Sequence, residues 1–155
     1  MTGPVEVRAE PPDSADGRRC RQAYYDELAA RFEGGFAADA DELASDAQMQ
    51  PPSGVFVVAR LAGRAVGCGG IKWVEPDTAE IKRVWTDPAA RRMGVARKIL
   101  AALEAEARRA GARTVRLDTN RVLHEAKALY QSLGYAEVAP FNNEPVAHHW
   151  FAKTL

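Results

Sequence analysis

One segment of the sequence limits the fold more than any other, because it combines the end of a strand, a short loop and the beginning of a long helix. It reads Val84-Trp-Thr-Asp-Pro-Ala-Ala-Arg-Arg-Met-Gly-Val-Ala96. The first amides of a helix have no partner within the helix, and the helix dipole adds partial positive charge there. Gly94 lets the backbone approach a ligand closely, and Ala96 keeps that approach open. The segment therefore predicts an anion site that suits a pyrophosphate.

Cationic side chains surround this loop, and two better-known nucleotide motifs do not account for it. The surrounding cations are Arg91, Arg92, Arg97 and Lys98. No GxxxxGK(S/T) sequence occurs in the chain, which excludes a P-loop. The run Gly67-Cys-Gly-Gly-Ile-Lys72 begins like a dinucleotide fingerprint, but a lysine stands where the third glycine should be. That run also precedes a strand rather than a helix, which excludes the dinucleotide motif.

Hydrophobic periodicity predicts the elements on either side of this segment. We expect strands at residues 5–8, 55–59, 65–74, 79–86, 115–117, 135–138 and 147–153, and helices at residues 16–32, 39–47, 92–110 and 123–133. Hairpin strands followed by two βα units are typical of an α/β (α+β) fold with a mixed sheet and helices on both faces. The chain has no internal repeat and no low-complexity linker, so we expect a single domain over residues 1–155.

Composition excludes several function classes. Of the 155 residues, 46% are hydrophobic and 27% charged, and the formal net charge is zero. A globular protein without net charge has no global field that draws it to nucleic acid or to an anionic membrane, so we expect neither partner.

Cys20 and Cys68 lack zinc-ligand spacing, which predicts no metal site, and Cys68 in its apolar run is expected to be a reduced core thiol. No signal peptide or membrane-spanning run is visible, so we expect the cytoplasm.

Two motifs in order resemble the GNAT superfamily of N-acetyltransferases. Arg91-Arg-Met-Gly-Val-Ala96 matches the (Q/R)-x-x-G-x-(G/A) acyl-CoA signature, with Pro88 three residues before it. Leu129-Tyr-Gln-Ser-Leu-Gly-Tyr135 matches the second family element at the expected distance downstream. The resemblance covers about residues 55–138 well and the first fifty residues hardly at all. It implies a GNAT-like, mostly antiparallel sheet of about six or seven strands.

The resemblance also implies acetyl-CoA as cosubstrate and a role for individual residues. The backbone of Val84, Trp85 and Thr86 would pair with the pantetheine arm like an added strand. The backbone amides that would hold the pyrophosphate belong to Arg91, Arg92, Met93, Gly94, Val95, Ala96 and Arg97. Tyr130 would contact the cofactor near the thioester sulfur and protonate the departing thiolate. A neutral amine would attack the thioester directly, without a covalent enzyme intermediate.

One position departs from the family pattern. Many members have an asparagine seven residues before the tyrosine, where it contacts the cofactor. Leu123 occupies that position here, and either Asn120 or His124 is a candidate substitute.

An amine acceptor arrives as an ammonium ion, so a base is needed near the thioester. Glu80 is the first candidate, acting through water, although a solvated or ion-paired strand carboxylate explains it equally well. His148 and His149 are the second, and hydrogen bonds within the last strand would also explain them. They belong to residues 141–151, a tail that resembles one in a bacterial branch of the superfamily and would reach the acceptor. We therefore expect Asn143 and His149 to bind the acceptor.

Charge is divided along the chain, with acidic residues in the helical N-terminal region and basic residues in the middle. A basic half suits polyanionic CoA and an acidic half suits a cationic acceptor, so we expect a small-molecule primary amine. A non-catalytic acyl-CoA-binding module and a protein acetyltransferase that acts on lysine or an N-terminus remain alternatives. Tyr130 favours an enzyme, since a pure binder needs no proton donor. Members of the superfamily often dimerise through sheet edges, so the resemblance also allows a homodimer.

Overall fold

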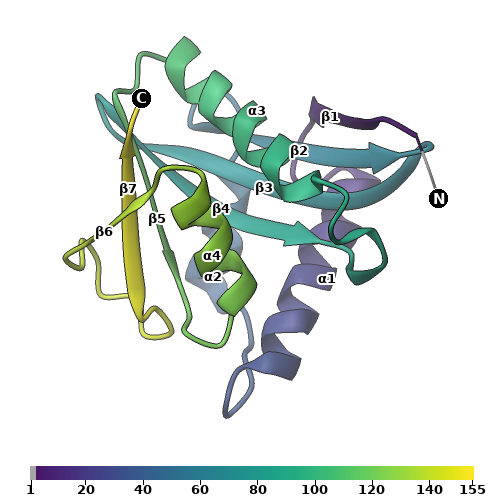
Figure 1. Cartoon of the computed structure of the whole chain (residues 1–155), viewed down its shortest axis with the longest axis horizontal. Helices are drawn as coiled ribbons and strands as arrows, with labels where there is room; N and C mark the ends of the chain where they lie inside the picture. Colours follow the sequence, from purple (N-terminus) through teal and green to yellow (C-terminus); the bar gives the residue numbers. More distant parts are fainter. Residues whose placement is uncertain (1–2) are drawn as a thin grey trace.

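The computed structural model describes residues 3–155 and contains the predicted elements in the predicted order (Figure 1). The strands are β1 Val5–Ala9, β2 Gly54–Leu61, β3 Arg64–Glu75, β4 Thr78–Thr86, β5 Thr114–Thr119, β6 Ala136–Val138 and β7 His149–Thr154. The helices are α1 Ala15–Arg31, α2 Ala40–Ala47, α3 Val95–Arg109 and α4 His124–Ser132, with a single 3-10 turn at Pro88–Ala90. No helix among the described residues is long and apolar enough to cross a membrane.

The seven strands form one sheet in the order β1-β2-β3-β4-β5-β7-β6. All neighbouring strands are antiparallel except β4 and β5, which are parallel. Helices α1 and α2 cover one face of the sheet, and α3 and α4 cover the other (Figure 1). The expected mixed, mostly antiparallel sheet with helices on both faces is therefore confirmed.

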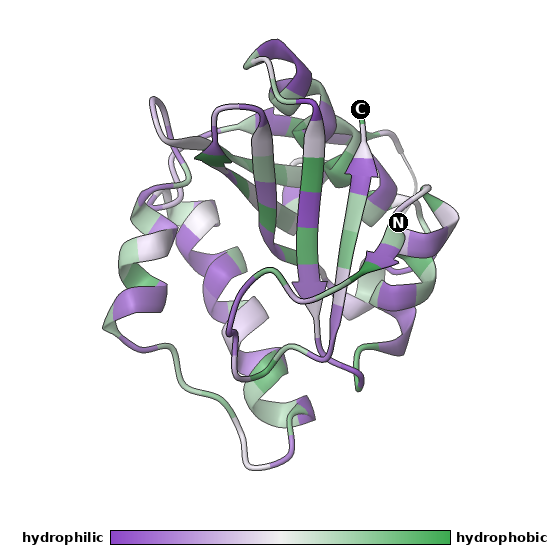
Figure 2. Cartoon of the chain, turned by 90° about the vertical axis from the view of Figure 1, so that its left-hand side faces the viewer, coloured by the Kyte–Doolittle hydropathy of each residue, from purple (hydrophilic) through white to green (hydrophobic). Residues whose placement is uncertain are grey.

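The sheet has a separate hydrophobic core on each face. Val57 of β2 packs with Ile99 of α3 in the larger core, whereas the adjacent Phe56 packs with Cys20 of α1 and with Cys68 in the smaller one. A strand covered on both sides is apolar at consecutive positions, which explains the unbroken hydrophobic run in β2. Strands with a less protected face show bands of opposite hydropathy instead (Figure 2). Both cysteines are buried free thiols, as expected for Cys68.

The parallel strands β4 and β5 separate part-way along their length. They pair only from Thr78 to Glu80 and from Thr114 to Arg116. Beyond Glu80, β4 continues to Thr86 without a partner on that side, and the two strands diverge (Figure 1). This divergence leaves the backbone edge of β4 open towards a ligand, in the segment where the sequence predicts cofactor contacts.

The long helix begins three residues later than periodicity predicts. The expected start was residue 92, but α3 begins at Val95. Arg92 and Gly94 have left-handed backbones with φ of 66° and 76°, which no continuous right-handed helix accommodates. Residues 91–94 therefore form a loop that leads into the first turn of α3.

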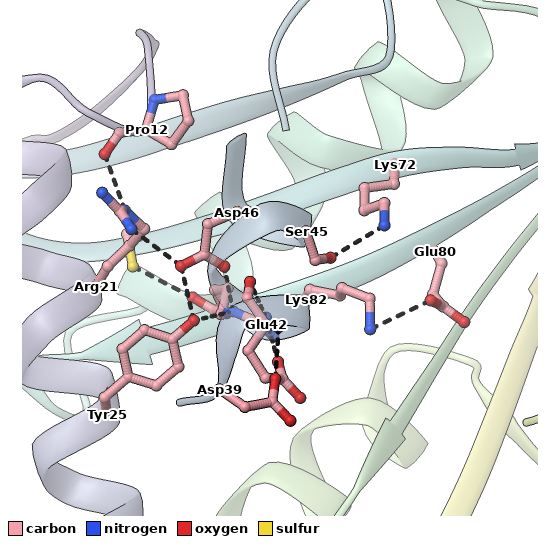
Figure 3. Close-up of polar contacts among 12 residues, drawn as sticks. Pro12, Arg21, Tyr25, Asp39, Glu42, Ser45, Asp46, Lys72, Glu80 and Lys82 are labelled. Atoms are coloured by element: carbon pink, nitrogen blue, oxygen red, sulfur yellow. Dashed lines mark hydrogen bonds and ion pairs between the residues drawn. The ribbon is translucent and has the colours of Figure 1, made fainter. Parts of the chain in front are cut away.

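A bulge in β4 turns Arg83 out of the regular strand. Its φ is 62°, and the pairing of β3 with β4 shifts register opposite it, between Cys68 and Gly70. The side chain is 6% exposed and donates to Asp46 at 2.7 Å and to the Tyr25 hydroxyl at 2.9 Å. Arg83 thereby joins β4 to both α1 and α2, around the cluster drawn in Figure 3.

Candidate active site

A cleft of about 460 Å³ lies between the end of β4, the loop before α3, and helices α1 and α4. All but one of the predicted cofactor residues line it, namely Val84, Trp85, Thr86, Arg91, Arg92, Gly94, Val95, Ala96, Arg97 and Tyr130. The exception is Met93, whose side chain lies outside the lining and is 37% exposed. The fold thus gathers two motifs that lie more than thirty residues apart in the sequence.

The donors at one end of the cleft fit a pyrophosphate. Gly94 is the N-cap of α3, and no side chain caps the first turn, so its amides face the cleft without a competing side-chain acceptor. Arg91, Arg92 and Arg97 line the same end. Backbone N–H groups at a helix N-terminus together with guanidinium groups form the donor set that phosphate oxygens bind. The residues present therefore suit the diphosphate of a CoA-type ligand.

A second, smaller cavity of about 100 Å³ adjoins the cleft. Aromatic side chains of α1 and of the following loop form one wall, including Tyr24, Phe32 and Phe36. Strands β4 and β5 and the segment before β7 form the other. The residues shared by both cavities are Tyr24, Leu28, Val84, Leu123, Ala126 and Tyr130. These shared walls show that the two cavities meet where β4 and β5 diverge.

Tyr130 stands at this junction with its hydroxyl unpaired. Its ring packs against Tyr135 and Phe151, with centroids 5.9 and 6.2 Å away, and the residue is 7% exposed. Within residues 3–155 the hydroxyl has no hydrogen-bond partner, and no unpartnered side-chain oxygen there is fully buried. The hydroxyl is therefore accessible, and Tyr130 lines both cavities. Burial raises the pKa of Tyr130 above its ordinary range, and the group stays protonated at neutral pH.

Glu80, the predicted base, lines neither cavity. It lies 3.2 Å from Arg116 and 3.4 Å from Lys82, and Figure 3 shows Lys82 pointing towards it. The reason is topological: Glu80 is the last residue of β4 that pairs with β5, so it precedes the divergence that opens the site. Its contacts match the alternative of an ion-paired strand carboxylate.

The predicted acceptor residues also lie outside the smaller cavity. His149 places Nδ1 2.8 Å from the Glu137 carboxylate, and Asn143 is absent from the lining. His148 accepts a hydrogen bond from the Arg121 amide through Nδ1. Two other residues of the tail, Glu144 and Val146, do line the smaller cavity. Those two residues precede β7, whereas His149 is already part of the strand.

The position that departs from the family pattern is apolar in the structure as well. Leu123 lines both cavities and caps α4 without a side-chain hydrogen bond. Asn120 does not supply a free amide in its place, because Nδ2 donates to the Val146 carbonyl at 2.8 Å and Oδ1 accepts from Val122 N at 3.0 Å. His124 is not among the lining residues.

The predicted site residues did not include the carboxylates of the smaller cavity, which are Glu42, Asp118 and Glu144. Burial raises the pKa of both the Asp118 and the Glu144 carboxyl, and the neighbouring Glu42 carboxylate adds to each shift. In the sequence, Asp118 looks like one polar residue of an alternating strand. The structure distinguishes Asp118, because it lies beyond Arg116, in the part of β5 that no longer pairs with β4.

The model of the family described as "Acetyltransferase (GNAT) family" matches residues 21–135, which include both motifs and the whole length of β4. The chain belongs to the acetyltransferase (GNAT) family. As a member of this family, the protein is an acyltransferase. Residues of both motifs line the same cleft of this acetyltransferase.

Individual relatives agree with the family. An IAA acetyltransferase of Azospirillum brasilense is 35% identical over 107 residues, which are 68% of this acetyltransferase and 70% of the relative. The solved structure of an acyl-CoA N-acyltransferase of Klebsiella pneumoniae is 30% identical with a TM-score of 0.77, covering 97% of each chain. The structure of yncA of Salmonella typhimurium, described as an acetyltransferase with its cofactor acetyl-CoA, has the same fold. It is 21% identical with a TM-score of 0.74, covering 98% of this chain and 94% of that one.

Proposed function

We propose that this acetyltransferase moves the acetyl group of acetyl-CoA directly onto a primary amine of a small molecule. The observation that carries the proposal is the position of the Tyr130 hydroxyl, unpaired and at the junction of a cleft and a smaller cavity. A thioester reaching from the cleft and a nucleophile held in the cavity would meet beside this hydroxyl. Catalysis by such positioning requires no covalent link to the protein.

Acetyl-CoA is supported as the cosubstrate by the shape and donors of the cleft. The first amides of α3 and the nearby arginines would hold the diphosphate, while the open edge of β4 at Val84 and Trp85 offers backbone groups to the amide-containing pantetheine arm. The yncA relative, which shares the fold, was solved with acetyl-CoA.

A small amine is supported by the size and charge of the second cavity. A volume of about 100 Å³ suits part of a small molecule. The Asp118 and Glu144 carboxylates of its lining favour a cationic acceptor. The two cations of the lining are already paired, Arg83 with Asp46 and Glu42, and Lys82 with Glu80.

The chemistry assigned to Tyr130 is hydrogen bonding to the developing thiolate. Acetyl-CoA supplies the activated acetyl carbonyl. A thiol has a pKa of about 8.5, whereas burial holds the pKa of Tyr130 above its ordinary range, so complete proton transfer from Tyr130 to sulfur is unfavourable. Donating a hydrogen bond to sulfur while the negative charge forms still stabilises the transition state. The proton that finally resides on sulfur then comes from the attacking nitrogen.

The test combines calorimetric titration with acetyl-CoA and a thiol-release assay. The assay screens phenylethylamine, putrescine, glucosamine, a lysine-containing peptide and IAA. We expect micromolar binding of acetyl-CoA and thiol release with at least one small amine. Tyr130→Phe should lower kcat about tenfold or more with little change in acetyl-CoA affinity.

Three outcomes would contradict the proposal in different ways. Binding of acetyl-CoA without thiol release for any acceptor would favour the non-catalytic acyl-CoA-binding module. Turnover of the peptide alone would favour a protein acetyltransferase. Turnover of IAA alone would refute a primary amine as acceptor.

A further inference from the structure

Asp118 lies in the stretch of β5 that lines the smaller cavity. It is two residues beyond Arg116, the last residue of β5 paired with β4, and directly precedes Thr119 at the end of the strand. It lines the cavity together with Tyr130, and on its other side it pairs in register with Trp150 of β7. The backbone of Asp118 is thus paired with β7, but it lies beyond the part of β5 that pairs with β4.

A specific hydrogen-bond chain fixes the orientation of this carboxylate. The Trp150 indole donates to Asn142 Oδ1 at 2.9 Å, and an indole N–H can only donate. The amide oxygen of Asn142 must therefore face Trp150, which turns Nδ2 towards Asp118 Oδ2 at 2.9 Å. The Glu144 amide also donates to Asn142 Oδ1, at 3.2 Å.

The second oxygen of the carboxylate is available to a ligand. Within residues 3–155, Asp118 Oδ1 has no hydrogen-bond partner, and no side-chain oxygen in that range is buried without one. Oδ1 is therefore accessible, and Asp118 lines the cavity that Tyr130 also lines. Glu80 differs in this respect, because both of its oxygens take part in ion pairs.

The groups around Asp118 favour a base stronger than an ordinary aspartate. Glu80 of β4 and Glu42 of α2 disfavour its ionised form, whereas Lys82 of β4 favours it. The other ionisable side chains of the lining are Glu144 in the segment before β7, Arg83 of β4, Tyr25 of α1, Tyr24 of α1 and Tyr130 of α4. Burial is the largest cause of the raised pKa of the Asp118 carboxyl; Glu80 and Glu42 add to it, and the Asn142 hydrogen bond and Lys82 oppose it. The net rise increases the basicity of the carboxylate.

We infer that Asp118 is the general base that takes a proton from the ammonium group of the acceptor, and that Asn142 is its positioning residue. This inference rests on the proposed transfer to an amine. One N–H bond of the ammonium breaks, its proton moves to Asp118 Oδ1, and the nitrogen keeps the electron pair. That pair forms the C–N bond as the C–S bond breaks, and the second proton lost by nitrogen goes to the thiolate. Asp118 then returns its proton to water.

The decisive test is the pH dependence of Asp118→Asn, measured by thiol release with the amine turned over best in the panel above. At pH 7 we expect kcat to fall by about 10²–10⁴-fold, the usual contribution of a general base. The deficit should shrink as the pH rises towards the pKa of the amine, because free amine then needs no base. Acetyl-CoA affinity, measured by calorimetry, should stay unchanged.

Two further variants separate catalysis from structure. Glu144→Gln removes a carboxylate from the same cavity, and we expect it to raise the KM for the amine without a deficit that shrinks at high pH. Asn142→Leu removes the bond that favours ionised Asp118, so the acid limb of the kcat/KM profile should move to higher pH. A purely structural role of Asn142 would lower activity without moving that limb.

The outcomes that overturn the inference differ from those that overturn the proposed function. An Asp118→Asn enzyme with near-native kcat, or with a deficit independent of pH, refutes Asp118 as the base while amine acetylation stands. A wild-type enzyme that turns over no amine refutes the proposed function, and the assignment of Asp118 with it.

Discussion

The guanidinium of Arg83 in β4 lies 2.7 Å from the Asp46 carboxylate in α2, and both side chains are almost completely buried. Arg21 and the Tyr25 hydroxyl, both of α1, bond the other oxygen of the same carboxylate at 3.0 and 2.7 Å. This cluster holds α1 and α2 against the sheet. It therefore fixes the walls that Tyr24, Tyr25 and Glu42 contribute to the smaller cavity.

Asp46→Ala should destabilise the fold strongly. The substitution leaves the Arg83 charge buried without one of its two carboxylate partners, and breaking a buried pair costs about 3–5 kcal/mol. Denaturant unfolding followed by circular dichroism measures the loss. Asp41→Ala removes an exposed carboxylate from the same helix and should cost less than about 1 kcal/mol. Equal losses for the two variants would show that the buried cluster does not anchor the helices.

Gly94→Glu should weaken acetyl-CoA binding about tenfold or more, or about 1.4 kcal/mol. It places a carboxylate where the diphosphate would bind, and a left-handed backbone with φ of 76° adds strain. Gly63→Glu is the matched control, because φ there is 78° and a Cβ likewise meets nothing within 4 Å, but Gly63 lies in the β2–β3 turn. Calorimetry should find native affinity in the control. Equal weakening by both variants would assign the effect to strain.

Glu27→Gln should strengthen acetyl-CoA binding. The Arg91 guanidinium lies 2.7 Å from Glu27 across the cleft, so it must divide its charge between this carboxylate and a bound diphosphate. Releasing an exposed ion pair is worth up to about 1 kcal/mol, or about fivefold in Kd at low salt. Asp26→Asn removes the same charge from the adjacent position, which bonds Gln22 instead, and should change Kd less. An unchanged Kd for Glu27→Gln would mean that Arg91 does not contact the ligand.

Asp118→Asn should stabilise the fold at neutral pH although it removes activity. Burial raises the pKa of Asp118 above its ordinary value of 3.8, so ionisation costs more in the folded chain than in the unfolded one. This cost grows as the pH rises above 3.8 and is constant above the folded pKa. Asparagine avoids it and still accepts the bond from Asn142. The variant should therefore unfold at higher denaturant concentration at pH 7, with a difference that disappears near pH 3.8. A less stable variant at pH 7 would contradict the prediction.

Much of the fold could be predicted from local patterns. All eleven predicted strands and helices are present, and where an element buries one face, as α3 and β5 do, backbone geometry alone sets the repeat of its apolar residues. The start of α3 was the main error, since a positive φ at Arg92 is a property of the closed loop and not of arginine. That residues 84–97 contribute to one cleft was also predictable, since they are neighbours along the chain at the junction of a strand and a helix.

The residues of the smaller cavity could be identified only from the tertiary structure. Glu80 and Asp118 are both acidic residues in strands, and sequence favoured Glu80 because it leads into the pyrophosphate loop. The structure places Glu80 in the paired part of β4 and Asp118 in the part of β5 that has separated from it. Tyr24 and Glu42 join Asp118 in the lining of the smaller cavity, from helices far away in the chain.

The order of the elements and the loop before α3 depend on residues that are neighbours along the chain, so the amino-acid sequence specifies them locally. The point where β4 and β5 separate, and the side chains that face the space between them, follow from the folded chain instead. This opening depends on pairing and packing between segments distant in sequence, such as Arg83 with Asp46 and Asp118 with Asn142.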